Sequence, residues 1–190
     1  MGVLRAVVRA PLVARERPIA MDVVVACGIQ HAYFGKTGTR YLGDKADILK
    51  VRMGSFLAEE RARGSVVFAA REVHQPNDPF YRQMRSHSVV GTEDIEIPEA
   101  FKPYIKFIVN TTRPSAFFST PLESEVHKLK PDKVHVVGVE THMAVLFTAE
   151  EFRNMGYEVV VHEALTCSED DYLHALGINL LANSLSAVVL

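Results

Sequence analysis

The chain has no tryptophan, only two cysteines and no long basic run. Cys27 and Cys167 are too few to form a disulfide framework, and free thiols suit a reducing compartment, so we expect a cytoplasmic protein. No apolar stretch approaches the roughly 20 residues that a membrane-spanning helix needs. The formal net charge is -2, so nothing in the charge distribution favours nucleic acid or an anionic membrane as a partner.

The composition is that of one ordinary globular domain. The chain has 190 residues, of which 48% are hydrophobic, and this length is ample for a core. Residues 1–20 are apolar but carry four arginines, which interrupt any signal-peptide core. We interpret this segment as an N-terminal arm or extra edge strand before a single domain of residues 21–190. A transit-type leader is the alternative.

Hydrophobic patterns predict that strands and helices alternate from residue 22 onward. Short apolar, β-branched runs predict strands buried on both faces, at residues 22–26, 65–70, 106–109, 134–137, 158–162 and 187–190. Helical spacing of apolar residues predicts helices, at residues 43–64, 121–130, 141–156 and 168–182.

Two segments carry more specific expectations. In the helix at 43–64 we expect an apolar face and a charged face; the inward residues are Ile48, Leu49, Phe56 and Leu57, and the outward residues are Glu59, Glu60, Arg61 and Arg63. Residues 71–103 have little periodicity and include Pro76, Pro79 and Pro98. A loop of that length in a compact domain is either functional or wrongly assigned.

Alternating elements with strands apolar on both faces predict an α/β fold of three layers, α-β-α. Right-handed crossovers then give a doubly wound parallel sheet. Ligands in such sheets bind beyond the carboxyl ends of the strands, where the strand order reverses. If the strands at 22–26 and 134–137 are neighbours at that reversal, Gly28 and the turn Thr141–Ala144 face one crevice.

The turn after the strand at 134–137 begins a helix. Gly138 breaks the strand, and Thr141 is a suitable N-cap residue. Unpaired amide N–H groups at a helix start attract negative charge, so chemistry is expected there. The residue best placed to act is Ala144, which has no reactive atom.

Five segments, in order along the chain, resemble one protein family. They read CGIQHAYF, REVHQPND, HSVVGT, TTRPSAFFSTPL and GVETHMAVLFTAEEFRNMGYEVVVHEALTCSEDD. This set resembles the isochorismatase-like hydrolases, also called cysteine hydrolases, which include nicotinamidases and N-carbamoylsarcosine amidases. The resemblance implies a six-stranded parallel sheet of Rossmann-like order, and dimers or larger homo-oligomers.

The chemistry of that family rests on an Asp, a Lys and a Cys, and all three are replaced here. Counting from the family motifs, the matching positions are Gly28 for the aspartate, Thr111 for the lysine and Ala144 for the cysteine. Glycine cannot accept a proton, threonine cannot supply a cation, and alanine has no atom that can attack a carbonyl. The resemblance therefore implies a pseudoenzyme that binds a small-molecule ligand or a partner. The alternative is an active hydrolase of a small amide or a related C–N or ether substrate, either metal-assisted or dependent on acid–base residues that the sequence does not identify.

Substitute catalytic groups are few. The side chain of Cys27 alternates with Gly28, so we expect its thiol to point into the core. Cys167 precedes a predicted helix start, where a thiol pKa can fall, and is either a substitute nucleophile or an ordinary loop residue. His142 is either a base or a structural histidine, since two residues along a helix turn it away from Ala144.

Other parts of the family's site have counterparts. Nicotinamidases hold a metal with an Asp-x-His and a later His, and the matching residues are Glu72, His74 and His87. One carboxylate and two imidazoles suit a divalent ion such as Zn²⁺, Mn²⁺ or Fe²⁺. Solvated loop side chains are the alternative, because Glu is a longer arm than Asp.

The resemblance also implies an oxyanion pocket around Glu140, Thr141 and Ala144. Backbone amides of Glu140 and Ala144 would form it, with a cis peptide before Glu140, so that carboxylates or other anions can bind without turnover. The pocket walls are expected from aromatic side chains, for which burial in the core is the alternative; these are Tyr33, Phe34, Phe117 and Phe118.

Overall fold

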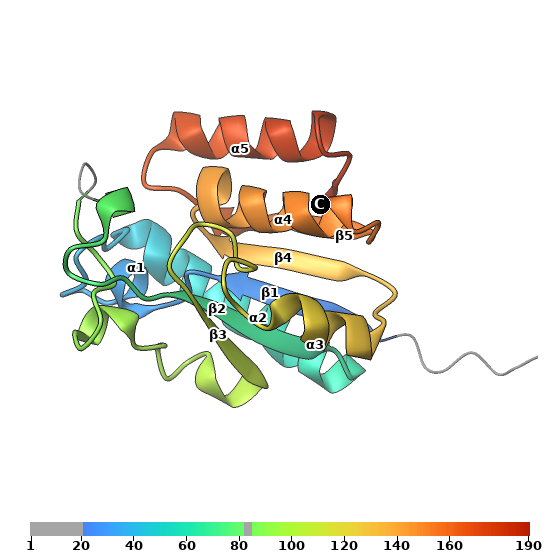
Figure 1. Cartoon of the computed structure of the whole chain (residues 1–190), viewed down its shortest axis with the longest axis horizontal. Helices are drawn as coiled ribbons and strands as arrows, with labels where there is room; N and C mark the ends of the chain where they lie inside the picture. The colour runs from blue at the N-terminus through green and yellow to red at the C-terminus, as the bar shows by residue number, and fades with distance from the viewer. Residues whose placement is uncertain (1–20, 82–84) are drawn as a thin grey trace, which may run out of the picture.

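The computed structural model describes residues 21–81 and 85–190, and the arm predicted for residues 1–20 lies outside them. Six parallel strands form one sheet in the order β3-β2-β1-β4-β5-β6 (Figure 1). The strands are β1 (Val23–Cys27), β2 (Val66–Glu72), β3 (Phe107–Thr111), β4 (Val134–Val139), β5 (Val159–Cys167) and β6 (Val188–Val189). The predicted doubly wound α/β sheet is confirmed, with bounds that shift by a few residues.

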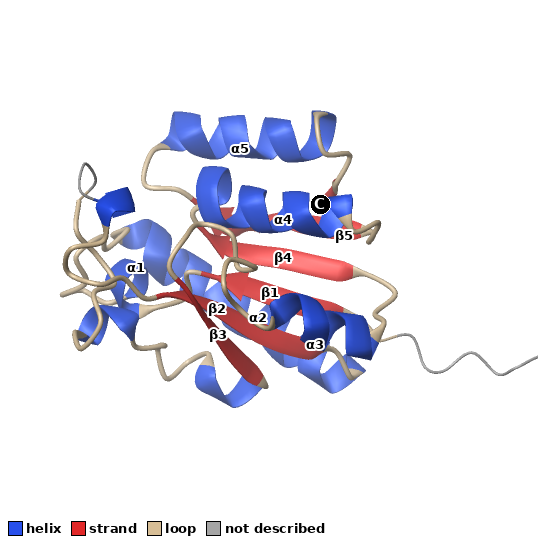
Figure 2. Ribbon diagram, in the orientation of Figure 1, coloured by secondary structure: helices blue, strands red, loops and turns tan. Residues whose placement is uncertain are grey.

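Helices cover both faces of the sheet (Figure 2). They are α1 (His31–Phe34), α2 (Asp44–Arg63), α3 (Leu122–Leu129), α4 (Leu146–Asn154) and α5 (Asp171–Asn183). In the long segment predicted as a loop, residues 71 and 72 end β2, and the described residues beyond them form three short 3₁₀ turns, at Pro79–Tyr81, Glu93–Ile95 and Lys102–Tyr104. Within the described residues, no helix is both long enough and apolar enough to span a bilayer.

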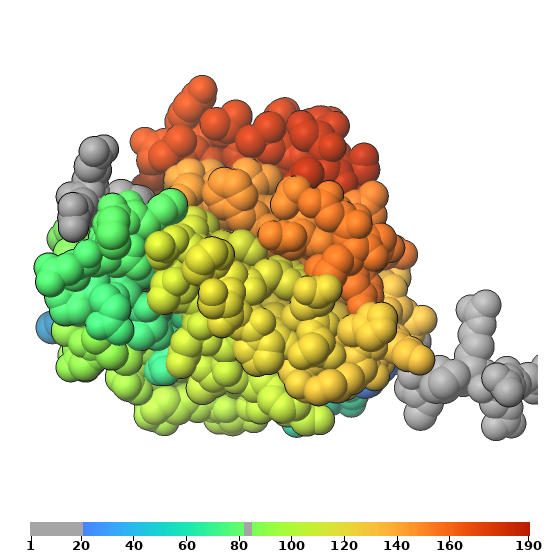
Figure 3. All heavy atoms as spheres, in the orientation of Figure 1, coloured from blue at the N-terminus to red at the C-terminus, as the bar shows by residue number. Residues whose placement is uncertain are grey.

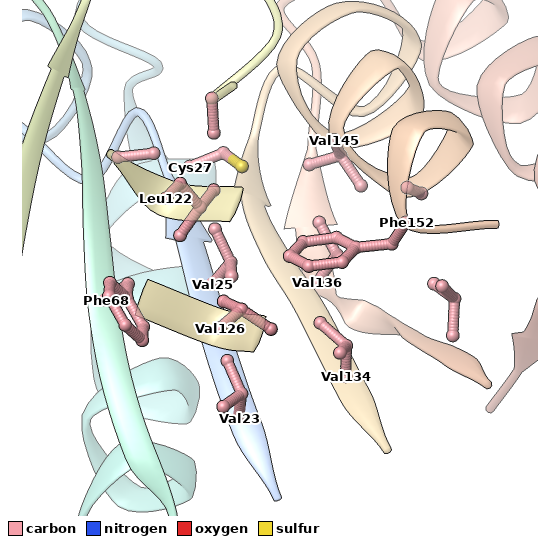
Figure 4. Close-up of a cluster of buried hydrophobic side chains, with 14 of the residues drawn as sticks. Val23, Val25, Cys27, Phe68, Leu122, Val126, Val134, Val136, Val145 and Phe152 are labelled. Carbon is pink, nitrogen blue, oxygen red and sulfur yellow. The ribbon is translucent and has the colours of Figure 1, made fainter. Parts of the chain in front are cut away.

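Alternate residues of each strand face two separate cores, as the pleat of a strand requires. On one face, Val23, Val25 and Val136 pack with residues of α3, α4 and α5 (Figure 4). On the other face, Val24 and Val137 pack with α1 and α2. In the space-filling view, α3, α4 and α5 form much of the visible surface (Figure 3). The central strands are therefore buried on both sides, whereas the edge strand β3 alternates exposed and buried residues, with Ile108 52% exposed.

The predicted faces of α2 are partly wrong. Ile48 is 53% exposed, whereas Glu60 is buried. The inward stripe follows steps of three and four residues, and it consists of Ala46, Leu49, Met53, Leu57 and Glu60. Glu60 tolerates burial because its carboxylate accepts hydrogen bonds from the Ser65 hydroxyl (2.6 Å) and from Arg63 (2.6 Å).

The strand order reverses between β1 and β4, which pair directly, as predicted. The carboxyl ends of the strands lie at the left in Figure 1, where α1 and the loop after β2 gather. Parallel α/β sheets bind their ligands at this edge.

Candidate functional site

The three positions matched to the family triad all lie at the carboxyl edge of the sheet. Gly28 directly follows β1, Thr111 is the last residue of β3, and Ala144 lies in the turn after β4. All three are buried. The structure therefore brings these positions to the one edge where the sequence analysis expected a crevice.

Gly28 has no room for a side chain. Its φ of +59° is a left-handed conformation that glycine adopts without strain. A Cβ added there would fall far inside contact distance of the Val139 carbonyl oxygen and 3.2 Å from Val139 Cγ2. The backbone N–H donates to the Ala70 carbonyl at 2.9 Å, which holds the segment in place. A carboxylate at this position requires the backbone to move.

Thr111 has a structural task. Its hydroxyl lies 2.9 Å from the carbonyl oxygens of Arg113 and Ser115, to which it donates, and it accepts from the Arg113 N–H at 3.1 Å. A hydroxyl has one proton and two lone pairs, so these contacts use its donor and one acceptor site. Thr111 closes the loop that follows β3.

Ala144 lies in a π-helical turn, Thr141–Val145, before α4. The prediction of Thr141 as an N-cap is wrong: Glu140 precedes the turn without a capping hydrogen bond, and Thr141 Oγ1 lies 2.8 Å from His174 Nδ1. The Thr141 hydroxyl therefore contacts α5 and links the turn to that helix. The Val139–Glu140 peptide is cis, as the resemblance implied. Anion binding by Glu140, Thr141 and Ala144 stays a prediction.

A buried ion pair fills the space beside this turn. Arg40 Nη1 donates to Glu140 Oε2 at 3.0 Å, and Nη2 donates to Oε1 at 2.7 Å. The side chains of Arg40 and Glu140 are only 13% and 7% exposed. The guanidinium also contacts Glu169 at 3.2 Å and lies 5.5 Å from the centre of the Tyr33 ring. Sequence reasoning missed Arg40, because its partner is 100 residues away and no local pattern indicates the pairing.

The predicted metal ligands do converge. Glu72, His74 and His87 each offer a ligand atom within 4.8 Å of the others, and all three residues are buried. His87 Nε2 lies 2.9 Å from Glu72 Oε2, to which it donates, and Tyr33 donates to the same oxygen at 3.2 Å. His74 Nε2 lies 3.6 Å from Glu72 Oε2, which is too long for a hydrogen bond. The alternative of solvated loop side chains does not fit this burial.

His74 is the member of this cluster that fits a metal best. Among the described residues, both of its ring nitrogens are buried without a hydrogen-bond partner. Buried polar atoms are nearly always satisfied, so an unsatisfied imidazole beside a carboxylate suits a metal ligand. A cavity of about 280 Å³ reaches the cluster and is lined in part by His74 and His87.

The charges of the cluster also suit a cation. Burial alone would raise the pKa of Glu72, but the His74 and His87 imidazoles outweigh burial and hold that pKa at about 2. Burial lowers the pKa of His87, but its contact with Glu72 outweighs that effect and raises it. The carboxylate is therefore ionised over the whole neutral range, as a metal ligand must be.

Neither cysteine is an activated nucleophile. Cys27 is buried among apolar side chains (Figure 4), its thiol lies 3.7 Å from Thr148 Oγ1, and burial raises its pKa to about 12. The prediction of a core thiol is confirmed. Cys167 ends β5, and burial also raises its pKa. Thiolates are the reactive form of cysteine, so both thiols are unreactive at neutral pH.

His142 bonds away from Ala144. Its Nδ1 lies 2.9 Å from Ser168 Oγ, and burial lowers its pKa. This is the structural role expected from its place in the turn.

The four aromatic residues predicted as walls of the anion pocket lie in two different places, and neither place is a pocket lined by Ala144. Phe117 and Phe118 line an open apolar cavity of about 700 Å³, together with Phe80, Met143 and Phe147. Tyr33 and Phe34 do not line it; each is 1% exposed and belongs to the core beneath α2. Five cavities of the described chain are lined by residues other than Gly28, Thr111 and Ala144.

Known proteins resemble this chain in sequence and in fold. The family description "Isochorismatase domain" matches residues 22–190. A Bacillus subtilis (strain 168) protein, named uncharacterized isochorismatase family protein PncA, is 26% identical over 168 residues, which are 83% of this chain and 92% of that protein. The crystal structure of nicotinamidase PncA from Bacillus subtilis has a TM-score of 0.81 and 23% identity, and the match covers 88% of this chain and 98% of that one.

A second solved structure holds a metal. Pyrazinamidase of Pyrococcus horikoshii, solved in complex with zinc, has a TM-score of 0.77 and 17% identity over 89% of this chain and 98% of that one. At such identity the likeness establishes the fold alone. Together with the family match over most of the sequence, it leads to one conclusion: the chain belongs to the isochorismatase family of hydrolases.

Proposed function

We propose that this chain is a family member without cysteine-amidase activity, which binds a divalent metal ion and a small anionic ligand instead. The observation that carries the proposal is the closed position at Gly28, where no carboxylate fits beside Val139. Amidase chemistry through a thiol needs a base to deprotonate it and a sulfur to attack. The family positions supply neither, and the two existing thiols are held protonated by burial.

Glu72, His74 and His87 would hold the metal in this proposal. When bound, such an ion supplies a positive centre that attracts a carboxylate or polarises a carbonyl. Glu72 contributes negative charge, His74 offers an unpaired nitrogen, and His87 would exchange the 2.9 Å contact of its Nε2 with Glu72 for the ion. The adjoining cavity of about 280 Å³ sets the size of the ligand to that of a small organic acid.

The proposal is tested by activity and binding together. An amide panel with nicotinamide, pyrazinamide and N-carbamoyl compounds is assayed for ammonia release, with and without Zn²⁺. We expect no turnover, and a Zn²⁺-dependent rise in melting temperature with small carboxylates. His74→Ala should abolish the part of that rise that depends on the carboxylate, whereas the exposed His127→Ala should leave it unchanged.

A second candidate, metal-assisted hydrolysis, is favoured by one observation, the unpaired nitrogens of His74 beside an ionised Glu72. Ammonia release that needs Zn²⁺, stops with a chelator and is lost in His74→Ala would establish metal-assisted hydrolysis. It would also overturn the proposal of a family member without amidase activity. Release that survives the chelator would contradict both candidates.

The proposal includes a homo-oligomer. Four large apolar side chains that line the 700 Å³ cavity are 37–46% exposed, and a second copy would cover them; they are Phe80, Phe118, Phe147 and Met155. Sedimentation equilibrium of the full chain tests this, with Phe147→Glu expected to shift the protein to the monomer. A wild-type monomer at tens of micromolar would contradict it.

A further inference from the structure

A second cluster of metal-ligating side chains lies at the opposite end of the sheet. Asp22 directly precedes β1, Glu60 lies near the end of α2, and His135 is the second residue of β4. Each offers a ligand atom within 4.8 Å of the other two. Asp22 and His135 lie at the amino ends of β1 and β4, at the right in Figure 1. Glu72 lies at the opposite edge, where it ends β2. The family match and the proposed function give this cluster no role.

The spacing suits ligands of one ion. His135 Nε2 lies 3.3 Å from Asp22 Oδ2. Two ligands about 2.0–2.1 Å from a tetrahedral metal are roughly 3.3 Å apart, so this pair needs little movement to bind one ion. Glu60 completes the set with a buried carboxylate, on the same side of the sheet as His135.

The surroundings of these residues resemble the supporting contacts of a metal site. A ligating histidine usually gives its other ring N–H to a polar partner, and ligating carboxylates are themselves hydrogen-bonded. His135 Nδ1 lies 3.0 Å from His162 Nε2, on neighbouring β5. Glu60 accepts from Ser65 and Arg63, and each of its oxygens keeps a further lone pair for a metal.

An apolar wall closes one side of the cluster. The ring of Phe56, on α2, lies 4.7 Å from the centre of the His162 ring and 5.9 Å from that of His135. The two imidazoles stack at 5.2 Å, with 22° between their planes. Phe56 therefore limits the positions that both rings can adopt, which prepares the nitrogen of His135 for a fixed ligand.

From this geometry we infer that Asp22, Glu60 and His135 form a second divalent-metal site, with His162, Ser65 and Arg63 as its supporting contacts. Two carboxylates and one imidazole suit a borderline ion such as Zn²⁺. The bound ion joins the start of β1 to α2 and β4, so its role is structural. No cavity described above opens onto it, and no reaction is assigned to it.

The test separates this site from the group Glu72, His74 and His87, called the Glu72 cluster below, by measuring metal stoichiometry. Full-length His74→Ala, freed of metal by a chelator, is dialysed against Zn²⁺ and its metal content is measured by mass spectrometry. We expect one equivalent per chain. Adding His135→Ala should remove that equivalent, and adding His127→Ala should not.

Milder variants keep the test decisive if His135→Ala unfolds, which circular dichroism reports. Asp22→Asn changes a side chain that is 28% exposed, and should weaken Zn²⁺ binding at least 10-fold. His162→Phe removes a supporting contact and should weaken it 10- to 100-fold. Binding that is unchanged in both variants overturns the inference.

The two proposals fail in different ways. If the wild type binds a single Zn²⁺ that His74→Ala removes, the second site is refuted and the proposed function stands. If His135→Ala or Asp22→Asn removes the single ion, the second site stands and the metal of the proposed function is refuted. Absence of any Zn²⁺ binding refutes both.

Discussion

The Glu72 cluster and the three triad positions lie at the same edge of one sheet but differ in how their polar groups are satisfied. Glu72, His74 and His87 are buried polar groups, and both ring nitrogens of His74 have no partner among the described residues. Gly28 and Ala144 have no polar side chain, and the Thr111 hydroxyl closes its own loop. A buried polar group left unpaired costs free energy, so it persists where something else repays that cost. This difference is the one that the proposed function requires, with a ligand site on one side of the edge and structural packing on the other.

The largest effect is expected at Gly28. Gly28→Asp and Gly28→Ala should each lower the free energy of unfolding by about 4 kcal/mol, through left-handed strain and the clash with Val139. Urea titration measures the change. Gly64→Ala is the matched control, because Gly64 also has a positive φ of +95° but nothing within 4 Å of its added Cβ; about 1 kcal/mol is expected there.

This result decides whether the family triad can be restored. Ala144→Cys is a small change in a buried position and should cost less than about 1.5 kcal/mol. The triple variant Gly28→Asp, Thr111→Lys, Ala144→Cys should then be destabilised and inactive, because the aspartate does not fit at position 28. A stable triple variant with amidase activity would contradict the closed site.

The next effect is expected at the ion pair beside the turn. Arg40→Met leaves the Glu140 carboxylate buried without its cation, and should cost about 3 kcal/mol. The double variant Arg40→Met, Glu140→Met removes both charges and should recover most of that loss. Lys102→Met is the control, because its partner Glu99 is 87% exposed and such surface pairs contribute less than about 1 kcal/mol. A loss at Arg40 no larger than at Lys102 would show that the pair does not stabilise the turn.

The Glu72 cluster should respond to metal, whereas the triad positions should not. In His135→Ala, which isolates this cluster, Zn²⁺ at 100 times its dissociation constant should stabilise the fold by about 2.7 kcal/mol. Glu72→Gln should abolish the stabilisation, because it removes the negative charge between the two histidines. Thr111→Val, made at the same edge, should leave it intact. Calorimetry with and without Zn²⁺ measures the stabilisation in each variant. If Glu72→Gln and Thr111→Val lose the same amount of it, the two regions do not differ in metal binding.

The fold and the candidate metal ligands were predictable because their signals lie in short segments of the sequence. Each strand is a short apolar run, and Glu72 and His74 stand two residues apart in a recognisable segment. Motif counting likewise gave the three triad positions, and the structure places all three at the expected edge. Here sequence order and spatial order agree, since parallel strands end together.

Distant contacts were not predictable in this way. Glu60 looks like a surface charge on a helix until Ser65 and Arg63 are seen to satisfy it. Thr141 looks like an N-cap, but His174 lies within hydrogen-bond distance of its hydroxyl from another helix. Arg40 has no motif at all, and only the fold brings it to Glu140. In each case a tertiary partner changed the role that the local pattern indicated.

The smallest effect concerns His87 and His142, two histidines at the carboxyl edge of the sheet whose pKa values shift in opposite directions. The Glu72 contact raises the pKa of His87, whereas burial lowers the pKa of His142, against an opposing effect of Glu140. Folded His142 therefore binds fewer protons than the unfolded chain, so its contribution falls as the pH drops below about 6.5, its ordinary pKa. The stability of wild type relative to His142→Gln should rise between pH 5 and pH 7.5, by less than about 1 kcal/mol because the side chain is half-buried. Denaturant titrations across that range measure the difference, with exposed His127→Gln as the control. A difference that falls with pH would mean that His142 is charged in the fold, and the turn would then resemble the Glu72 cluster.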